Sequence, residues 1–367
     1  MSIPKTIQIL TNLNCNLDCT YCYEEKQDRV NDIDSIKRFI EKQFAELGDF
    51  KGEVFVEIIG GEPFLYPELL GDITEFTLGL ARKHNRCLFF SLSTNGTLFD
   101  NEKVRDFVEK YGRFYEFGVS IDGKKEVHDK YRRYKGGEKG SYDVIIPHLP
   151  WLFKHVRSVG AKATLSEETM FDLSDSVIHL IELGFRSIGS NPTYESPISL
   201  EDGERLALEL IKIVDYVVDN KLEKKIKHYQ LGDPDSNKGF LMALLSPPEE
   251  ERNYCGSGEY MRCLGFDDEV FGCNRFCTMN KPDMTIDQEG LREDIKSQYL
   301  KWPKECLECN LKFMCPSCAA ASYEEGKTPE EYFGEKRMCG WTYALAIAKL
   351  YYGSLLLRRE KTVSENI

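Results

Sequence analysis

The chain has 367 residues, of which 41% are hydrophobic and 30% charged, and this composition is typical of a soluble globular protein with room for two domains. A formal net charge of −13 argues against binding to nucleic acid, because phosphate recognition requires clustered Lys and Arg. The first residues resemble no signal peptide, and the apolar run at 341–357 is short and interrupted by Lys349 and Gly353. We therefore expect a cytoplasmic protein that binds neither nucleic acid nor membrane.

Three of the thirteen cysteines, Cys15, Cys19 and Cys22, lie within eight residues of one another near the start of the chain. In a chain without a secretory signal, many cysteines favour metal ligation in a reducing cytosol over disulfides. Three thiolates can hold three irons of a cubane iron–sulfur cluster and leave the fourth iron without a protein ligand. Half of a zinc site is the alternative, although zinc takes four ligands and no His lies nearby.

Short apolar runs alternate with amphipathic helical segments from residue 7 to about residue 220, which predicts parallel strands joined by crossover helices. We expect strands at residues 7–10, 53–59, 87–93, 114–121, 161–165 and 186–190. Two predicted helices bury apolar stripes, at Ile36, Phe39, Ile40 and Phe44 and at Leu210, Ile213, Val214 and Val217, and the second has a capping box at Ser199 and Asp202. A closed barrel has eight strand–helix units, so six units predict an α/β fold of the partial (β/α)6 barrel type, with its active site at the C-terminal ends of the strands.

Glycine-rich and polar motifs follow three of the predicted strands, at residues 60–63, 93–96 and 120–123. Paired glycines allow a backbone to approach a ligand closely, and Glu62 can accept a hydrogen bond from an ammonium group. The Ser and Asp of the third motif offer partners to a ribose or to an amino acid head group. Each motif taken alone is more often a simple turn.

A second group of nine cysteines lies between Cys255 and Cys339. Its two Cys-x2-Cys pairs are typical of ferredoxins and of zinc ribbons, so structural zinc is an alternative there too. The remaining cysteine, Cys87, opens a predicted strand and is expected to be a small buried hydrophobic residue. Loss of periodicity predicts domains at residues 1–230 and 253–367, joined by a linker at residues 231–252.

The spacing Cys15-x3-Cys19-x2-Cys22, with an aromatic residue before the last cysteine, resembles the radical S-adenosylmethionine (SAM) superfamily. The resemblance implies that the methionine end of SAM chelates the open iron and that reductive cleavage yields a 5′-deoxyadenosyl radical. It also implies a set of SAM-binding residues: Tyr21, Gly60, Gly61, Glu62, Ser93, Asn95, Ser120, Asp122 and Arg132. Within a stretch that resembles the family after the fourth strand, Arg132 is expected either to pair with the SAM carboxylate or to form a surface ion pair.

Together with that motif, the second group of cysteines resembles a SPASM domain, which carries two auxiliary 4Fe-4S clusters and brings the total to three. By this resemblance Cys255, Cys263, Cys273 and Cys318 hold the first auxiliary cluster, and Cys306, Cys309, Cys315 and Cys339 hold the second. The chain departs from the family pattern at Asp268, where a Gly is usual, and in the Cys315–Cys318 spacing, which is one residue shorter than common. Cys277 is therefore either a substitute ligand or a partly buried thiol beside the cluster.

SPASM proteins generally modify ribosomally made peptides, so the resemblance implies a peptide or protein substrate. We expect the radical to abstract hydrogen from such a peptide and to install a crosslink of the thioether, carbon–carbon or carbon–oxygen type. The open side of a partial barrel suits a peptide backbone. The expected electron donor is a protein such as flavodoxin or ferredoxin. Because little chain precedes Cys15, we expect any leader peptide to be read by this core or by a separate protein.

Two other functions stay open. Anaerobic sulfatase maturases have a similar cysteine layout, but those that resemble this chain carry an acidic base after the third auxiliary-cluster cysteine, where this chain has Asn274. An amide cannot hold a proton at neutral pH. Asp267, Asp268 or Glu195 could take that role instead. The third function is a non-catalytic iron–sulfur or zinc protein that uses its cysteines for electron transfer or architecture.

Overall fold

The computed structural model describes residues 5–232, 255–278, 301–316 and 318–364, together with residues 237, 240, 243–245 and 285. The chain forms two compact units. The first unit comprises residues 1–120, 128–159 and 255–297, and the second comprises residues 121–127, 160–254 and 298–367. Most of the expected linker at residues 231–252 lies outside the described residues, and the predicted domain boundaries remain predictions.

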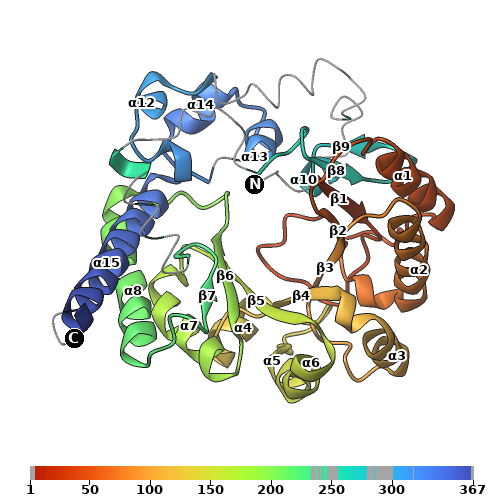
Figure 1. Cartoon of the computed structure of the whole chain (residues 1–367), viewed down its shortest axis with the longest axis horizontal. Helices are drawn as coiled ribbons and strands as arrows, with labels where there is room; N and C mark the ends of the chain where they lie inside the picture. The colour runs from red at the N-terminus through yellow and green to blue at the C-terminus, as the bar shows by residue number, and fades with distance from the viewer. Residues whose placement is uncertain are drawn as a thin grey trace. The chain divides into compact units, whose positions relative to one another are not determined.

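The sheet of the first unit consists of β1 (Lys5–Leu10), β2 (Val54–Ile59), β3 (Leu88–Thr94), β4 (Tyr115–Ser120), β8 (Met261–Leu264) and β9 (Val270–Phe271) (Figure 1). Its strand order is β4-β3-β2-β1-β8-β9, and every pair is parallel except β8 with β9. Ile7, Ile9 and Leu10 of β1 are fully buried, as expected for a central strand covered on both faces. The carboxyl ends of β1 to β4 therefore meet at one edge of this sheet.

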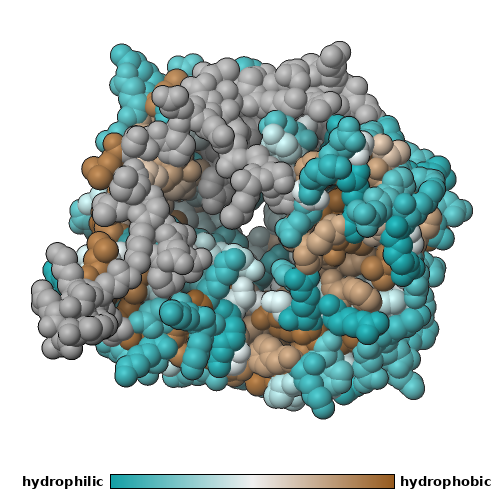
Figure 2. Space-filling model, viewed as in Figure 1, coloured by the Kyte–Doolittle hydropathy of each residue, from teal (hydrophilic) through white to brown (hydrophobic). Residues whose placement is uncertain are grey.

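The first unit contains α1 (Ile33–Ala45), α2 (Pro67–Lys83), α3 (Glu102–Tyr111), α5 (Tyr142–Ile145), α6 (Leu149–His155) and α10 (Asn274–Cys277), and α4 (Lys125–Tyr131) begins in the second unit and ends in the first. The stripe predicted for α1 is confirmed, since Ile36, Phe39, Ile40 and Phe44 are all buried. Figure 2 shows hydrophilic residues on the outer side of α1 and α2. Asp32 caps α1 by accepting a hydrogen bond from the N–H of Ser35 at 2.9 Å.

The second unit contains β6 (Ser187–Pro192), β7 (Lys227–His228) and all but the first two residues of β5 (Ser158–Leu165). Its helices are α7 (Leu173–Glu182), α8 (Leu200–Asp219), α12 (Lys304–Leu307), α13 (Ala319–Glu324), α14 (Pro329–Gly334) and α15 (Cys339–Ser364). The three strands are parallel. Ser199 caps α8 as predicted, because its hydroxyl accepts the Asp202 N–H at 3.1 Å. The apolar stripe predicted for α8 is buried.

The α8 and α15 helices pack closely where two glycines meet. A Cβ on Gly340 would lie 2.0 Å from the carbonyl oxygen of Ser199, and one on Gly203 would lie 2.6 Å from the carbonyl oxygen of Gly340. The N–H of Gly340 also donates to the carbonyl of Ile198 at 3.1 Å. The prediction of a packed C-terminal helix is confirmed, and none of the described helices is long and apolar enough to cross a membrane.

All six predicted strands are confirmed to within a few residues. The prediction for Cys87 was wrong, because its side chain is exposed. Strand β3 begins one residue later, at Leu88, and Cys87 contributes only its carbonyl, which accepts the Val54 N–H at 3.0 Å. The residue lies at the edge where the sheet begins, where no core side chain covers it.

Candidate active site

The first three cysteines lie on one loop that follows β1. Cys15 is buried, Cys19 is half-buried and Cys22 is exposed, and the loop turns back where the Cys22 N–H donates to the carbonyl of Cys19 at 3.1 Å. The sulfur of Cys15 accepts the Leu17 N–H at 3.4 Å and the side-chain amide of Asn95 at 3.7 Å. Burial raises the pKa of the Cys15 thiol to about 12, and the Leu17 hydrogen bond opposes this. Donors aimed at a sulfur suit a ligating thiolate.

The segment after α4 pairs with this loop, and an isolated antiparallel bridge joins Leu17 to Tyr134. Residues 131–135 pair with it through the Asp18 N–H on the Arg133 carbonyl at 2.7 Å and the Thr20 N–H on the Tyr131 carbonyl at 3.2 Å. Arg132 is buried, with 7% of its surface exposed, and its expected pairing, with the SAM carboxylate or in an ion pair, stays a prediction. Its guanidinium lies 5.3 Å from the centre of the Tyr21 ring, which stacks on Tyr131. Residues 131–135 therefore pack against the loop that carries the first three cysteines.

The paired glycines allow the end of β2 to lie against the same loop. A Cβ on Gly61 would lie 2.2 Å from the carbonyl oxygen of Asn14, and one on Gly60 would lie 2.8 Å from that of Asn12. The Gly61 N–H donates to Asn12 at 2.9 Å and the Glu62 N–H donates to Asn14 at 2.8 Å. The two glycines therefore allow the backbone at the end of β2 to pack directly against the cysteine loop.

Glu62 has no exposed surface and joins the ends of β2 and β3. Its carboxylate accepts the Phe64 N–H at 3.0 Å, the Thr94 hydroxyl at 2.8 Å and the Asn95 N–H at 2.7 Å. Burial raises the pKa of Glu62 to about 7 although these three hydrogen bonds lower it. An ionised carboxylate has about four acceptor positions, so one position remains for a further donor.

Sequence reasoning missed the asparagines of the cysteine loop. The carbonyls of Asn12 and Asn14 accept the N–H groups of Gly61 and Glu62. The Asn16 side chain accepts the Asn95 amide at 2.8 Å and donates to Thr97 at 2.7 Å. The signal was present in the order Asn-Leu-Asn-Cys-Asn. Residues at every second position of extended chain lie on one side, and three asparagines on one side indicate a polar contact surface.

The other predicted SAM-binding residues lie at or near strand ends. In the first unit, Ser93 is half-buried in β3 opposite Gly118 of β4, and Ser120 is the last residue of β4. In the second unit, Asp122 is 2% exposed and accepts the Thr164 N–H of β5 at 2.9 Å. These contacts leave the predicted roles of the three side chains as predictions.

Three of the cysteines assigned to the first auxiliary cluster lie in the first unit. Cys255 is exposed, Cys263 is buried in β8, and Cys273 precedes α10. At the end of α10, the sulfur of Cys277 lies 3.4 Å from that of Cys263. The Asn274 N–H at the start of this helix donates to the Gln8 side chain of β1 at 3.0 Å, which fixes α10 on the sheet.

Asp268, the departure from the family pattern, lies in the turn between β8 and β9. Asp267 and Asp268 have φ values of 58° and 61°, in the left-handed region that favours Gly. The Asp268 carboxylate accepts hydrogen bonds from the Ser35 hydroxyl and, on both oxygens, from Arg38 at 3.0 Å. These hydrogen bonds lower the pKa of Asp268. Asp267 forms an ion pair with Arg29 at 2.5 Å. Both carboxylates are thus engaged with cations, and Glu195 is exposed in the second unit.

Asn274, the residue that follows Cys273, contacts two polar side chains. Its side-chain amide donates to the Tyr23 hydroxyl at 2.5 Å, and the Arg275 guanidinium lies 5.2 Å from the centre of the Tyr23 ring. Tyr23 is also hydrogen-bonded to the carboxyl of Glu24, whose pKa burial raises to about 7. The sequence alone did not single out Tyr23 or Glu24, because neither belongs to the cysteine motif.

Four thiols of the second unit line one cavity of about 290 Å³: Cys306, Cys309, Cys315 and Cys339. Most of the remaining wall is apolar and includes Trp302 and Phe333. Burial raises the pKa of Cys315 to about 12, and the neighbouring thiols raise it further. Cys318 lies at the start of α13 and does not line the cavity. Within the described ranges, no three His, Cys, Asp or Glu side chains have the spacing to hold a single metal ion.

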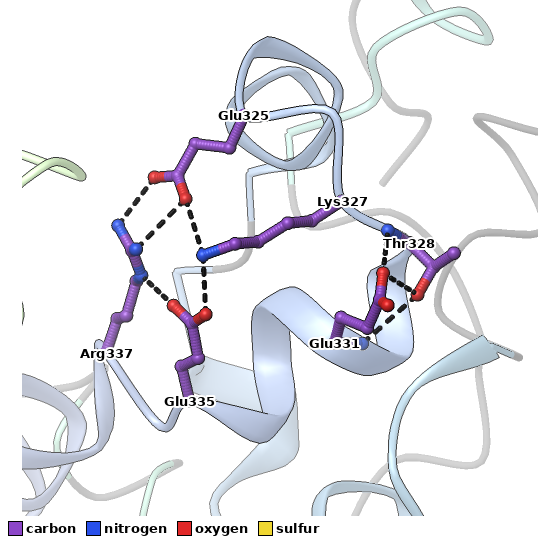
Figure 3. Close-up of polar contacts among 6 residues, drawn as sticks. All are labelled: Glu325, Lys327, Thr328, Glu331, Glu335 and Arg337. Carbon is purple, nitrogen blue, oxygen red and sulfur yellow. Dashed lines mark hydrogen bonds and ion pairs between the residues drawn. The ribbon is translucent and has the colours of Figure 1, made fainter.

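An ion network orders the chain just before Cys339 (Figure 3). Arg337 pairs with Glu325 and Glu335, each at 2.6 Å, and Lys327 bridges the same two carboxylates at 2.9 and 2.5 Å. Thr328 and Glu331 form a capping box at the start of α14. Exposed pairs taken singly contribute little, but a closed network of four charges fixes the geometry of its segment.

A family model described as the radical SAM superfamily matches residues 9–166. A serine-type anaerobic sulfatase-maturating enzyme of Bacteroides thetaiotaomicron is 24% identical over 338 residues, which are 82% of this chain and 78% of that protein. The structure of native anSMEcpe with bound AdoMet and Cp18Cys peptide has a TM-score of 0.70 and 18% identity, over 96% of this chain and 100% of that one.

The structure of Streptococcus suis SuiB bound to its precursor peptide SuiA has a TM-score of 0.58 and 15% identity, over 90% of this chain and 75% of that one. At these identities, likeness to a solved structure establishes the fold alone. It confirms the predicted fold class, an α/β partial barrel with a cysteine-rich C-terminal region.

Proposed function

Because this chain belongs to the radical SAM superfamily, we propose that it abstracts hydrogen from a ribosomally made peptide and installs a crosslink in it. A thioether, a carbon–carbon bond and a carbon–oxygen bond are the crosslinks that this chemistry covers. Support comes from the loop of Cys15, Cys19 and Cys22, which residues 131–135 hold in place. It also comes from two similar proteins whose structures contain peptides, anSMEcpe and SuiB. We choose a peptide crosslink over formylglycine formation because residue 274 is an Asn, whose side-chain amide donates to the Tyr23 hydroxyl and cannot act as a base.

Cys15, Cys19 and Cys22 would hold a 4Fe-4S cluster on the loop after β1. When bound, this cluster supplies the electron that cleaves SAM to methionine and a 5′-deoxyadenosyl radical. The chain's own contribution is to hold the thiolates. Leu17 and Asn95 donate to the sulfur of Cys15 and favour its deprotonated form.

Glu62 would accept the ammonium of SAM in its remaining acceptor position, and Arg132 would pair with the carboxylate. Asn95 links Glu62 to Cys15, since its backbone N–H donates to the carboxylate of Glu62 and its side-chain amide donates to the sulfur of Cys15. The binding site for SAM and the cysteine loop are thereby held by the same residue. Tyr21, Gly60, Gly61, Ser93, Ser120 and Asp122 complete the proposed SAM site.

The four thiols of the second-unit cavity fit a fully ligated auxiliary cluster, because apolar walls and four sulfurs are what such a cluster needs. We assign Cys306, Cys309, Cys315 and Cys339 to it, and Cys255, Cys263, Cys273 and Cys318 to a first auxiliary cluster. The enzyme would then hold three 4Fe-4S clusters, in domains at residues 1–230 and 253–367. A flavodoxin or ferredoxin would supply electrons in the cytoplasm, and this core or a separate protein would read the leader peptide.

Formylglycine formation is the second candidate, favoured by the sulfatase-maturating relative. That reaction must remove a proton from a Cys or Ser heteroatom of the substrate, and loss of a positioned base typically costs 10²–10⁴-fold in rate. Asn274 is no base, and Asp267 and Asp268 are tied to Arg29 and Arg38. Glu24 hydrogen-bonds to Tyr23, whose hydroxyl accepts the Asn274 amide.

The test compares the wild-type enzyme with Asn274→Asp after anaerobic reconstitution. Each is incubated with SAM, dithionite and a peptide carrying a sulfatase motif, and the products are analysed by mass spectrometry. We expect 5′-deoxyadenosine from both proteins and no multiple-turnover formylglycine from the wild type. Efficient aldehyde formation by the wild type would make sulfatase maturation the function. Iron analysis separates the non-catalytic zinc alternative, since three cubanes predict about 12 irons per chain and a zinc protein holds none.

A further inference from the structure

Cys277 is the cysteine of the second group that neither assigned ligand set uses. We propose that its thiol donates a hydrogen bond to the sulfur of Cys263 and thereby raises the reduction potential of the first auxiliary cluster. This inference rests on the proposed function, because it takes Cys263 as a ligand of that cluster. Cys277 is on this view a positioning residue that acts through a ligand.

The acceptor sulfur is held rigidly. Cys263 has no exposed surface and lies in β8 between two partner strands, opposite Gln8 of β1 and Phe271 of β9. A residue paired on both sides cannot rotate its backbone without breaking the sheet. The position of the Cys263 sulfur is therefore set by β1 and β9.

The donor is fixed by the short helix α10. The Asn274 N–H binds the Gln8 side chain at 3.0 Å, and Gln8 in turn donates to Glu57 of β2 at 2.8 Å. Phe276 of the same helix is fully buried. These anchors place the Cys277 sulfur 3.4 Å from Cys263 and 3.6 Å from the carbonyl of Cys273. A thiol has one proton, and a thiolate at Cys263 is the stronger acceptor of the two.

The distance also argues against two ligands. A cubane binds each thiolate at a different iron, and the four sulfurs point away from one another. Two sulfurs 3.4 Å apart are in contact, so Cys263 and Cys277 do not both ligate iron from these positions.

A hydrogen bond to a ligating sulfur changes the redox chemistry of a cluster. The reduced cluster carries one more negative charge than the oxidised cluster, so a donor stabilises the reduced form and raises the potential. Removing the donor is expected to shift the equilibrium toward oxidation by about tenfold, which corresponds to about 59 mV for one electron.

The experiment uses full-length reconstituted enzyme as wild type, Cys277→Ala, Cys277→Ser and Cys87→Ala. Cys87 is the matched control, because it is an exposed cysteine of the same unit. Iron per chain and the midpoint potential of each cluster, followed by electron paramagnetic resonance, are measured. We expect about 12 irons in every variant, a lower potential of one auxiliary cluster in Cys277→Ala, and recovery in Cys277→Ser, whose hydroxyl also donates.

Each other outcome overturns the inference in a recognisable way. Loss of about four irons in Cys277→Ala makes Cys277 a ligand. Unchanged potentials in both variants make it a packing thiol. If Cys277→Ala does not fold, a potential in Cys277→Ser below that of the wild type counts against the hydrogen bond. A wild type with only about four irons removes the auxiliary clusters and the proposed function with them.

Discussion

Glu62 is fully buried, which makes this residue a sharp test of the proposed SAM site. Changing Glu62 to Gln keeps the size of the side chain and removes the charge. A charge-assisted hydrogen bond contributes about 1.5–3 kcal/mol, so SAM affinity should fall about tenfold or more. Equilibrium titration with SAM measures this, with Glu68→Gln as an exposed control in the same unit. Unchanged affinity would remove Glu62 from the site.

A buried histidine gives the second unit a pH-dependent stability. Burial lowers the pKa of His228 to about 3, and its ring contacts the Ser190 hydroxyl at 3.2 Å and the Leu231 N–H at 3.3 Å. The folded-state pKa lies below the ordinary value of 6.5, so this stability is complete above pH 6.5 and declines as the pH falls toward 3.

Replacing His228 with Gln removes the titration and keeps a neutral polar side chain. Between pH 7.5 and 5.5, the wild type should lose about 1.4 kcal/mol of unfolding free energy relative to His228→Gln, because one proton binds only the unfolded chain. Urea denaturation at the two pH values measures the difference. Parallel losses in the two proteins would show that His228 does not titrate on unfolding.

Single residues were predictable from the sequence where chemistry restricts the residue type. The three spaced cysteines and the pair Gly60 and Gly61 were recognisable, because few other residue types can bind iron or allow so close a backbone contact. Asn12, Asn14 and Asn16 were not, since their value lies in backbone and amide contacts that appear only once β2 and β3 are in place. Asp268 read as a departure from a pattern, and the structure shows that it adopts the left-handed geometry of the usual Gly with the help of Ser35 and Arg38.

At the scale of elements, the crossing of α8 and α15 links a helix contact to a thiol. Gly340 follows Cys339 directly, and an added Cβ would meet the Ser199 carbonyl oxygen at 2.0 Å. We expect Gly340→Ala to destabilise the second unit by about 1–3 kcal/mol through overpacking and to lose the cluster assigned to Cys339. Anaerobic thermal unfolding and iron analysis measure both effects.

Gly353→Ala is the matched control for that prediction, because Gly353 lies in the same helix. Its nearest neighbour, the carbonyl oxygen of Asn237, would be at an ordinary 3.7 Å from the new Cβ. Ala is favoured over Gly in a helix interior by about 1 kcal/mol, so this variant should be as stable as the wild type or more so. Equal destabilisation of the two variants would contradict a specific role for the crossing.

Strands and long helices were predictable because alternating burial leaves a period in the sequence. The order β4-β3-β2-β1-β8-β9 was not, since β8 and β9 follow β1 by some 250 residues and a four-residue strand carries little pattern. The same holds for α10, whose four residues give no periodicity. Contacts that matter most for Cys263 and Cys277 thus depend on pairings distant in sequence.

At the scale of the whole molecule, the cysteine groups should be separable. Replacing Cys15, Cys19 and Cys22 with Ala is expected to abolish 5′-deoxyadenosine formation and to lower iron from about 12 to about 8 per chain, because the auxiliary ligands lie elsewhere in the sequence. Iron analysis and product chromatography after dithionite reduction measure this. Continued 5′-deoxyadenosine formation by the triple variant would refute the assignment of the loop.

The ion network before Cys339 has a consequence for the order of assembly. Its charges are no more than twelve positions apart along the chain, as are the partners of the capping box within it. Contacts this local form early and without distant strands. In a newly made chain, the segment that presents Cys339 would therefore take its shape before any iron arrives. Metal insertion into the second unit would then meet a segment that already has its shape.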